Sequence, residues 1–184
     1  MPSIIVVYHS GYGHTKAVAE QVAQGAAATL VAISPEGEIA EAEWADLDSA
    51  DAIIFGTPTY MGNVSWQFKK FADATSKAWF TRAWSDKVFG GFTNSASPSG
   101  DKQVAMIALQ TLASQHGGIW VSLNQAPSNT KVATGADINH LGGSVGLLTR
   151  VPADAAPDEV FSGDLESARL YGERIAAITA KLIC

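Results

Sequence analysis

The sequence of 184 residues has one cysteine, few basic side chains and no long hydrophobic run. The single cysteine, Cys184, cannot form a disulfide within the chain, which favours a reducing compartment. No apolar run approaches the roughly 18 residues that a membrane-spanning helix needs. Ser3–Tyr8 is too short to be the core of a signal peptide. We therefore expect a soluble, cytoplasmic protein with no membrane span.

Positive charge is scarce, because 12 lysines and arginines stand against 18 acidic residues, for a formal net charge of −6. Most nonspecific affinity for nucleic acids comes from cations that neutralise phosphates, and the chain has no Lys/Arg run. Nucleic-acid binding is therefore not expected. His9 and His140 lack a partner at metal-ligand spacing, so no metal site is expected either.

Five short apolar runs predict the strands of a single domain spanning residues 1–184. They are Ser3–Tyr8, Thr29–Ile33, Ala52–Phe55, Val88–Phe92 and Ile119–Leu123. The first is a continuous β-branched run, which is typical of a strand buried on both faces. Segments with helical apolar spacing alternate with the strands. This order predicts an α/β fold with a doubly wound five-stranded parallel sheet.

The predicted helices differ in how clearly the apolar residues mark their buried faces. One helix is expected from Val64 to Thr75, and another, over 103–115, is expected to bury Val104 and Ile107. The last helix is expected from Leu165 to Leu182. The polar stretch 124–163 is longer than a plain connection in a compact domain, so we interpret it as a functional insertion after the last strand.

Three segments follow strands and carry the residues suited to ligand binding. Ser10-Gly11-Tyr12-Gly13-His14-Thr15 stands between the first strand and a helix, where backbone amides and the helix N-terminus bind anions. It has neither a Walker ending nor the third glycine of a dinucleotide fingerprint. An ordinary turn with Ser10 or His14 as a cap is the alternative.

The other two segments follow the third and fourth strands along the chain. In Gly56–Asn63, Pro58 rigidifies the loop, while Tyr60 and Met61 offer surface to a planar ring. This segment is also compatible with a plain turn and a helix cap at Asn63. The hydroxyl-rich segment Thr93–Gly100 suits the polar edge of a flavin or simple solvation. Ligand-type loops on one edge of a parallel sheet imply one crevice.

Together these segments resemble the WrbA-type NAD(P)H:quinone oxidoreductases of the flavodoxin-like superfamily. The most specific matches are the first strand with Ser10–His14, the stretch Ile53–Thr59 with Gly62-Asn63, and the ending Ala168–Glu173. The resemblance covers nearly the whole chain. It implies a flavodoxin-like fold, FMN as cofactor, NADH or NADPH as electron donor, a quinone as acceptor, and a homotetramer with flavin sites at subunit contacts.

The resemblance also implies roles for individual residues. The first segment would surround the FMN phosphate, the second would lie beside the isoalloxazine ring, and the third would follow its polar edge. Tyr12 would contact the nicotinamide cofactor, Trp79 would line the acceptor site, and His116 would close the flavin pocket. From the residues alone, His116 could equally be a capping or solvent-facing residue at the end of the helix over 103–115, where a partial positive charge is favourable. The implied cofactor-binding residues are Ser10, Gly11, Tyr12, Gly13, His14, Thr15, Pro58, Thr59, Tyr60, Met61, Gly62, Asn63, Ser95, Ala96, Ser97, Pro98, Ser99, Gly100 and His116.

The chain departs from the family pattern in its second and third segments. Ala96, Pro98 and Ser99 stand where the family has glycines, and Tyr60-Met61 stands where Arg-Phe is common. The other tryptophans, Trp44, Trp66, Trp84 and Trp120, are expected in the core or at interfaces.

The first hypothesis for function is an FMN-dependent oxidoreductase with ping-pong kinetics, because donor and quinone would share one cleft. No acid–base catalytic residue is expected, since the flavin carries the electronic chemistry. The alternative is a flavodoxin-like electron carrier or flavin-binding module without its own substrate. A third option, an interaction protein that has lost its cofactor, follows from the altered third segment.

Overall fold

The apolar run near the N-terminus forms β1 (Ile4–Tyr8), and all five of its residues are buried. β2 (Thr29–Ala32), β3 (Ala52–Tyr60), β5 (Val88–Ser95) and β6 (Ile119–Trp120) lie parallel to it in the order β2-β1-β3-β5-β6. The computed structural model describes residues 1–183, so Cys184 lies outside the described residues. The predicted doubly wound, flavodoxin-like parallel sheet is confirmed.

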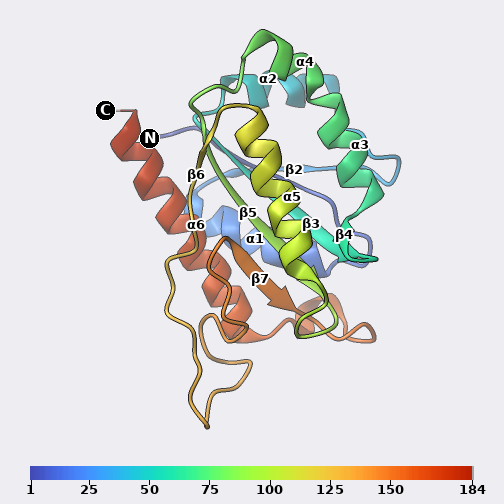
Figure 1. The fold of residues 1–184 in the computed structure, drawn as a ribbon, viewed down its shortest axis with the longest axis vertical. Coiled ribbons are helices and arrows are strands. Elements are labelled where there is room, and N and C mark those ends of the chain that lie inside the picture. Colours follow the sequence, from blue (N-terminus) through green and yellow to red (C-terminus); the bar gives the residue numbers. More distant parts are fainter. Residues whose placement is uncertain (184) are drawn as a thin grey trace.

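Helices cover both faces of the sheet (Figure 1). α1 (His14–Ala26) and α6 (Ser162–Leu182) cover the face that carries Val6 and Ile54. The opposite face, with Ile5 and Phe55, packs against four helices: α2 (Glu41–Ser49), α3 (Trp66–Ala74), α4 (Ser76–Thr81) and α5 (Lys102–Gln115). Burial on both faces explains why the strands are continuously apolar rather than alternating.

The insertion interrupts the last strand instead of following it. β6 pairs with the beginning of β5, and β7 (Leu147–Arg150) pairs with its end, both in parallel. The two short strands therefore share the fifth position of the sheet, and the loops between them extend away from the fold at the bottom of Figure 1. The prediction of an insertion after the last strand is wrong because β7 has only four residues within a Gly- and Pro-rich stretch.

Two segments predicted as loops begin as strand. β3 continues through Gly56–Tyr60, and β5 continues to Ser95, with Pro58 opposite Asn94. β3 then turns at Met61 and Gly62, both at positive φ, into the antiparallel β4 (Asn63–Val64). This hairpin moves the start of the next helix, so the prediction of a helix from Val64 is wrong.

The cap of α3 is Ser65 and not Asn63. The Ser65 hydroxyl accepts a hydrogen bond from the Phe68 amide at 3.2 Å, whereas the Asn63 side chain accepts from the Val64 amide within the hairpin. A serine acceptor satisfies one of the unpaired amides at a helix start. The predicted cap failed because both Asn63 and Ser65 are good capping types, and only the hairpin decides between them.

α5 presents a different face to the sheet from the one predicted. Its buried apolar residues are Ala105, Met106, Leu109 and Ala113, while Val104 and Ile107 are about half exposed. These four residues share one face of the helix at helical spacing, and that face packs on the sheet. Among the tryptophans, Trp84 is fully buried, Trp44 stacks on Phe71, Trp120 is half-buried and Trp66 is exposed.

α1 and α6 cross in direct backbone contact. A Cβ atom at Gly172 of α6 would lie 2.1 Å from the Val22 carbonyl oxygen of α1. A Cβ atom at Gly25 of α1 would lie 1.9 Å from the Arg169 carbonyl oxygen of α6. Because both obstacles are backbone atoms, neither helix has room for a side chain at the crossing.

We predict that Gly172→Ala lowers the free energy of unfolding by about 2–4 kcal/mol, since overpacking here must separate two helix backbones. Urea denaturation measures this loss. Ala177→Ser on the exposed side of α6 is the control, with a change of at most about 0.5 kcal/mol. Equal stability of Gly172→Ala and wild type would contradict the close crossing.

Candidate functional site

A cleft of about 340 Å³ opens at the carboxyl edge of the sheet, beyond the ends of β1, β3 and β5. This is the edge at which open α/β sheets bind ligands. None of the side chains that line it is an Asp, Glu, Lys or Arg. The lining residues are Tyr12, His14, Thr15, Pro58, Thr59, Tyr60, Asn94, Ser95, Ala96, Val151 and Ala153.

In the first loop, Ser10–Thr15, two backbone amides donate to the same side-chain oxygen. The Ser10 hydroxyl oxygen accepts hydrogen bonds from the Gly13 and Lys16 amides, each at 3.1 Å. Gly13 has φ of 89° and immediately precedes α1. The Ser10 hydroxyl therefore holds the turn in place at the N-terminus of α1, where the helix dipole favours negative charge. Of the two caps that the sequence offered for this turn, Ser10 and His14, the structure uses Ser10.

The loop does not use a basic side chain. Lys16 is exposed and faces Glu20, 3.8 Å away, one turn further along α1. Thr15, in contrast, is buried and lines the cleft. An anion in this loop would therefore be held by amides and hydroxyls rather than by a cation.

Two tyrosines form an aromatic wall of the cleft. The rings of Tyr12 and Tyr60 meet edge to face, with centroids 6.3 Å apart. A Cβ atom at Gly11 would lie 2.6 Å from the Tyr60 hydroxyl, so the glycine lets the ring approach the loop. Burial raises the pKa of Tyr60 above its usual value, which keeps this hydroxyl neutral. Tyr12 is 75% exposed, so much of its ring remains accessible.

The opposite wall comes from the chain that follows β7. Val151 and Ala153 line the cleft, and the Nε2 atom of His14 lies 2.8 Å from the Ala155 carbonyl oxygen. Pro157 packs so closely on Gly13 that an added Cβ would lie 2.7 Å from its ring. Residues distant in sequence thus enclose the first loop from outside.

Comparisons with known proteins agree with this geometry. Residues 34–132 match the family model described as NADPH-dependent FMN reductase. The chain is 62% identical over 99% of both chains to a protein from Pseudomonas aeruginosa named flavodoxin FldP. It is 32% identical, again over 99% of both chains, to a protein from Brucella ovis named NAD(P)H dehydrogenase (quinone).

Among solved structures, a WrbA-like flavodoxin from Agrobacterium tumefaciens superposes with a TM-score of 0.83 at 52% identity, over 98% of this chain and 99% of that one. The chain belongs to the WrbA-type family of flavodoxin-like proteins. The family resemblance that the sequence motifs indicated is therefore confirmed.

In this WrbA-type chain, about half of the predicted site residues contribute to the cleft or its loop. Tyr12, His14, Thr15, Pro58, Thr59, Tyr60, Ser95 and Ala96 line it. Ser10, Gly11 and Gly13 shape the first loop, as described above. The hairpin residues Met61, Gly62 and Asn63 lie beyond the cleft, and the Met61 side chain is fully exposed. Ser97, Pro98, Ser99 and Gly100 form the rest of the third loop, next to Ala96.

His116 and Trp79 do not line this cleft within one chain. His116 ends α5 and is 2% exposed. Its Nε2 atom lies 2.9 Å from the Thr75 hydroxyl, and its ring packs at a tilt against Trp84, with centroids 4.6 Å apart. Trp84 precedes β5, so this cluster lies at the amino edge of the sheet, opposite the cleft. Trp79 lies on α4 and is about half exposed. The structure of a single chain thus favours the helix-end interpretation of His116.

Three residues that line the cleft, Asn94, Val151 and Ala153, were not among the predicted site residues. Asn94 is buried, and its side-chain oxygen accepts from the Thr149 hydroxyl at 3.1 Å, which leaves its amide nitrogen as the group for a ligand. The Thr59 and Thr93 hydroxyls are 2.7 Å apart. Val151 and Ala153 were missed because β7 lies within the stretch that was predicted to be an insertion. Asn94 could have been found, since it stands at a strand end in the third segment.

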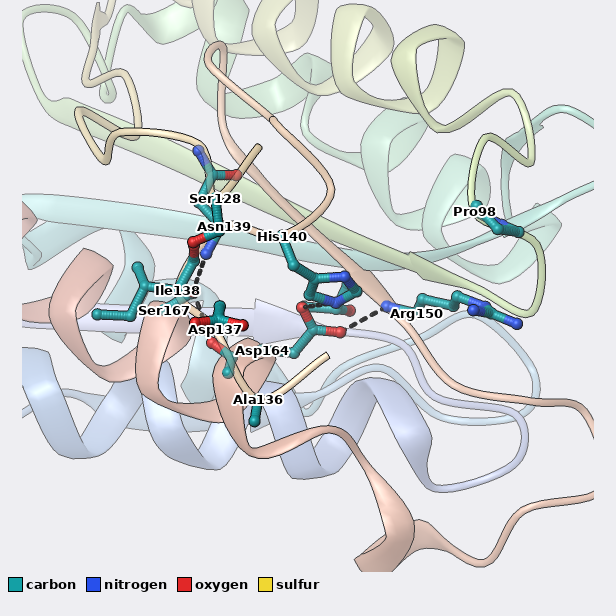
Figure 2. A network of polar contacts seen from close by, with 12 residues as sticks. Pro98, Ser128, Ala136, Asp137, Ile138, Asn139, His140, Arg150, Asp164 and Ser167 are labelled. Atoms are coloured by element: carbon teal, nitrogen blue, oxygen red, sulfur yellow. Dashed lines mark hydrogen bonds and ion pairs between the residues drawn. The ribbon is translucent and has the colours of Figure 1, made fainter. Parts of the chain in front are cut away.

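The buried carboxylate of Asp164 joins β7 to the insertion (Figure 2). Asp164, at the start of α6, accepts a hydrogen bond from the Arg150 amide at 2.8 Å and lies 3.0 Å from Nε2 of His140. Next to it, the backbone amide of Asn139 donates a hydrogen bond to the Ser167 hydroxyl at 2.9 Å. The insertion is thereby attached to α6. Burial raises the pKa of Asp164 to about 6, against the opposing effects of the Arg150 amide and His140.

Within residues 1–183, no cluster of three metal-ligating side chains is found. No helix among the same residues is long and apolar enough to cross a membrane.

The raised pKa of Asp164 predicts a pH-dependent contribution to stability. Between about pH 4 and pH 6 the folded state binds a proton that the unfolded state releases, so this contribution decreases as the pH rises. Asp164→Asn has no such titration. We expect the variant to gain about 1–3 kcal/mol relative to wild type between pH 4 and pH 7.

Urea denaturation of both proteins at several pH values measures the gain, with the exposed Asp154→Asn as control. A difference between Asp164→Asn and wild type that does not vary with pH would contradict the assignment.

Proposed function

We propose that this chain binds FMN in the cleft and catalyses electron transfer from NADH or NADPH to a quinone. The observation that carries the proposal is the cleft at the carboxyl edge of the sheet, which reaches the N-terminus of α1 and is lined there by the buried Thr15. A phosphate group fits a helix N-terminus without a neighbouring cation. The names of the family model and of the relatives at 32% identity support the same cofactor and reaction class.

The chain's own residues would bind and orient the cofactor. The first loop would hold the phosphate, the Tyr12 and Tyr60 rings would lie beside the isoalloxazine, and Asn94 would donate to its polar edge. Bound FMN would supply the hydride and electron transfer itself. The walls formed by Tyr60 and by Val151 would exclude water from one side of the ring system.

The uncharged lining favours a small, neutral acceptor. Protein partners of electron carriers are generally steered by complementary charge, and no charged side chain lines this cleft. A quinone, by contrast, needs apolar and aromatic surface. Donor and quinone would use the same opening in turn, which gives ping-pong kinetics. The homotetramer implied by the family resemblance stays a prediction that sedimentation analysis tests.

Reconstitution tests the cofactor and the reaction separately. We expect the purified chain to take up FMN, with a visible flavin spectrum after gel filtration, and to oxidise NADH or NADPH in the presence of benzoquinone. Parallel lines in double-reciprocal plots would support the ping-pong order. A colourless protein would overturn the cofactor proposal, and a yellow protein without quinone-dependent oxidation would overturn only the reaction.

The proposed phosphate site in the first loop, Ser10–Thr15, can be tested by removing its hydroxyl groups. Ser10→Ala with Thr15→Ala removes both hydroxyls and is expected to weaken FMN binding by about 10- to 100-fold, as charge-assisted hydrogen bonds are lost. Riboflavin, which has no phosphate, should bind both proteins equally. Quenching of flavin fluorescence measures both affinities.

Lys16→Ala is the matched control, since Lys16 faces Glu20. Its effect on FMN affinity should stay within about twofold, because exposed ion pairs contribute little. Equal losses in the two variants would show that charge, and not loop geometry, holds the phosphate.

A second candidate function is an electron carrier without its own substrate. It is favoured by the name flavodoxin FldP for the relative at 62% identity, a much higher identity than that of the quinone dehydrogenases. A carrier would show two well-separated one-electron potentials and a monomeric mass. Those two results together with absent quinone reduction would replace the enzyme proposal.

A further inference from the structure

Lys102, the first residue of α5, is a buried cation in an unfavourable place. Its side chain is 1% exposed, and burial lowers the pKa of its ammonium group to about 8. The N-terminus of a helix also repels positive charge. The ammonium group donates hydrogen bonds to the Ser97 and Pro98 carbonyl oxygens, the latter at 3.1 Å. The buried charge of Lys102 therefore binds the backbone of the third loop, Ser95–Gly100.

Arg150 holds the preceding carbonyl of the same loop. It extends from β7 toward the loop that carries Pro98 (Figure 2), and its Nε atom donates to the Ala96 carbonyl oxygen at 3.2 Å. Two cations therefore bind three consecutive carbonyls, those of Ala96, Ser97 and Pro98. The carboxylate of Asp164 attracts the Lys102 ammonium group and accepts a hydrogen bond from the Arg150 backbone amide, so it offsets part of the positive charge of this arrangement.

The fixed carbonyls determine where the loop's amides point. In a planar trans peptide the C=O and the following N–H point in opposite directions. Because the Ala96 and Pro98 carbonyls face the cations, the Ser97 and Ser99 amides face away from them. Within residues 1–183, neither amide donates a hydrogen bond. The loop adjoins the cleft through Ser95 and Ala96, which line it.

The loop has little backbone freedom of its own. Between Ser95 and Asp101 the single glycine is Gly100, and Pro98 has a fixed φ. Within the loop, the Ser95 hydroxyl donates to the Ser97 carbonyl oxygen at 3.3 Å. Lys102 and Arg150 add contacts from outside the loop to the carbonyls of residues 96, 97 and 98.

We propose that Lys102 is a positioning residue for the flavin: together with Arg150, it holds the third loop so that the Ser97 and Ser99 amides donate to the polar edge of the ring system. The inference rests on the proposed FMN site. It adds that affinity for the ring, and not only for the phosphate, depends on a cation that does not line the cleft.

The test compares Lys102→Met with Lys87→Met. Lys87 is the matched control because its ammonium group also donates to two carbonyls, those of Asp48 and Ala50, but at the amino edge of the sheet. Both variants should lower the melting temperature. Lys102→Met alone should weaken FMN and riboflavin binding, each by about tenfold, since the lost donors face the ring.

The reduction potential gives a second readout. Fewer donors at the polar edge stabilise the reduced flavin less, so the midpoint potential of Lys102→Met should be more negative than that of wild type. Lys87→Met should keep the wild-type potential. If Lys102→Met does not fold, Arg150→Met removes the Ala96 contact and should move both readouts in the same directions.

Unchanged riboflavin affinity and potential in a folded Lys102→Met protein would overturn the inference while leaving the FMN proposal intact. Equal effects of Lys102→Met and Lys87→Met would also overturn it, because they would indicate general destabilisation. A wild-type protein that binds neither flavin would overturn the proposed function itself.

Discussion

The parallel pairing of β1, β3 and β5 is the constraint on which the site depends. Parallel strands need crossover helices, and these helices bury both faces of the sheet. All carboxyl ends then meet at one edge, together with the N-terminus of α1. The three loops of the cleft converge because of this register, in which Tyr8 lies opposite Gly56 and Gly56 lies opposite Phe92.

The charged side chains near the cleft act on the backbone around it and do not line it. The cleft has no charged lining, and the proposed phosphate loop would act through the N-terminus of α1 and the Ser10 and Thr15 hydroxyls. The cations near it, Lys102 and Arg150, bind backbone carbonyls of the third loop instead of facing the cleft. An acidic protein can in this way hold a dianionic ligand, because local dipoles act over shorter distances than net charge.

The interrupted last strand links the insertion to the cleft. β7 carries Thr149 and Arg150 to the carboxyl edge, and the chain after it covers the first loop through Ala155 and Pro157. Asp164 and His140 then attach the insertion to α6. The segment that is most polar in the sequence therefore completes one wall of the site.

The sequence by itself determined the order of strands and helices, the first loop and the family, because each is encoded by local patterns: a β-branched run, a Gly-rich turn and motif spacing. Only the tertiary structure decided which residues face the cleft. Met61 lies in the exposed hairpin and not in the cleft, Val151 after β7 lines the cleft, and His116 lies at the opposite edge of the sheet. Ala105, Met106, Leu109 and Ala113, rather than Val104 and Ile107, form the buried apolar face of α5. These outcomes depend on contacts between residues far apart in the chain, which no local pattern contains.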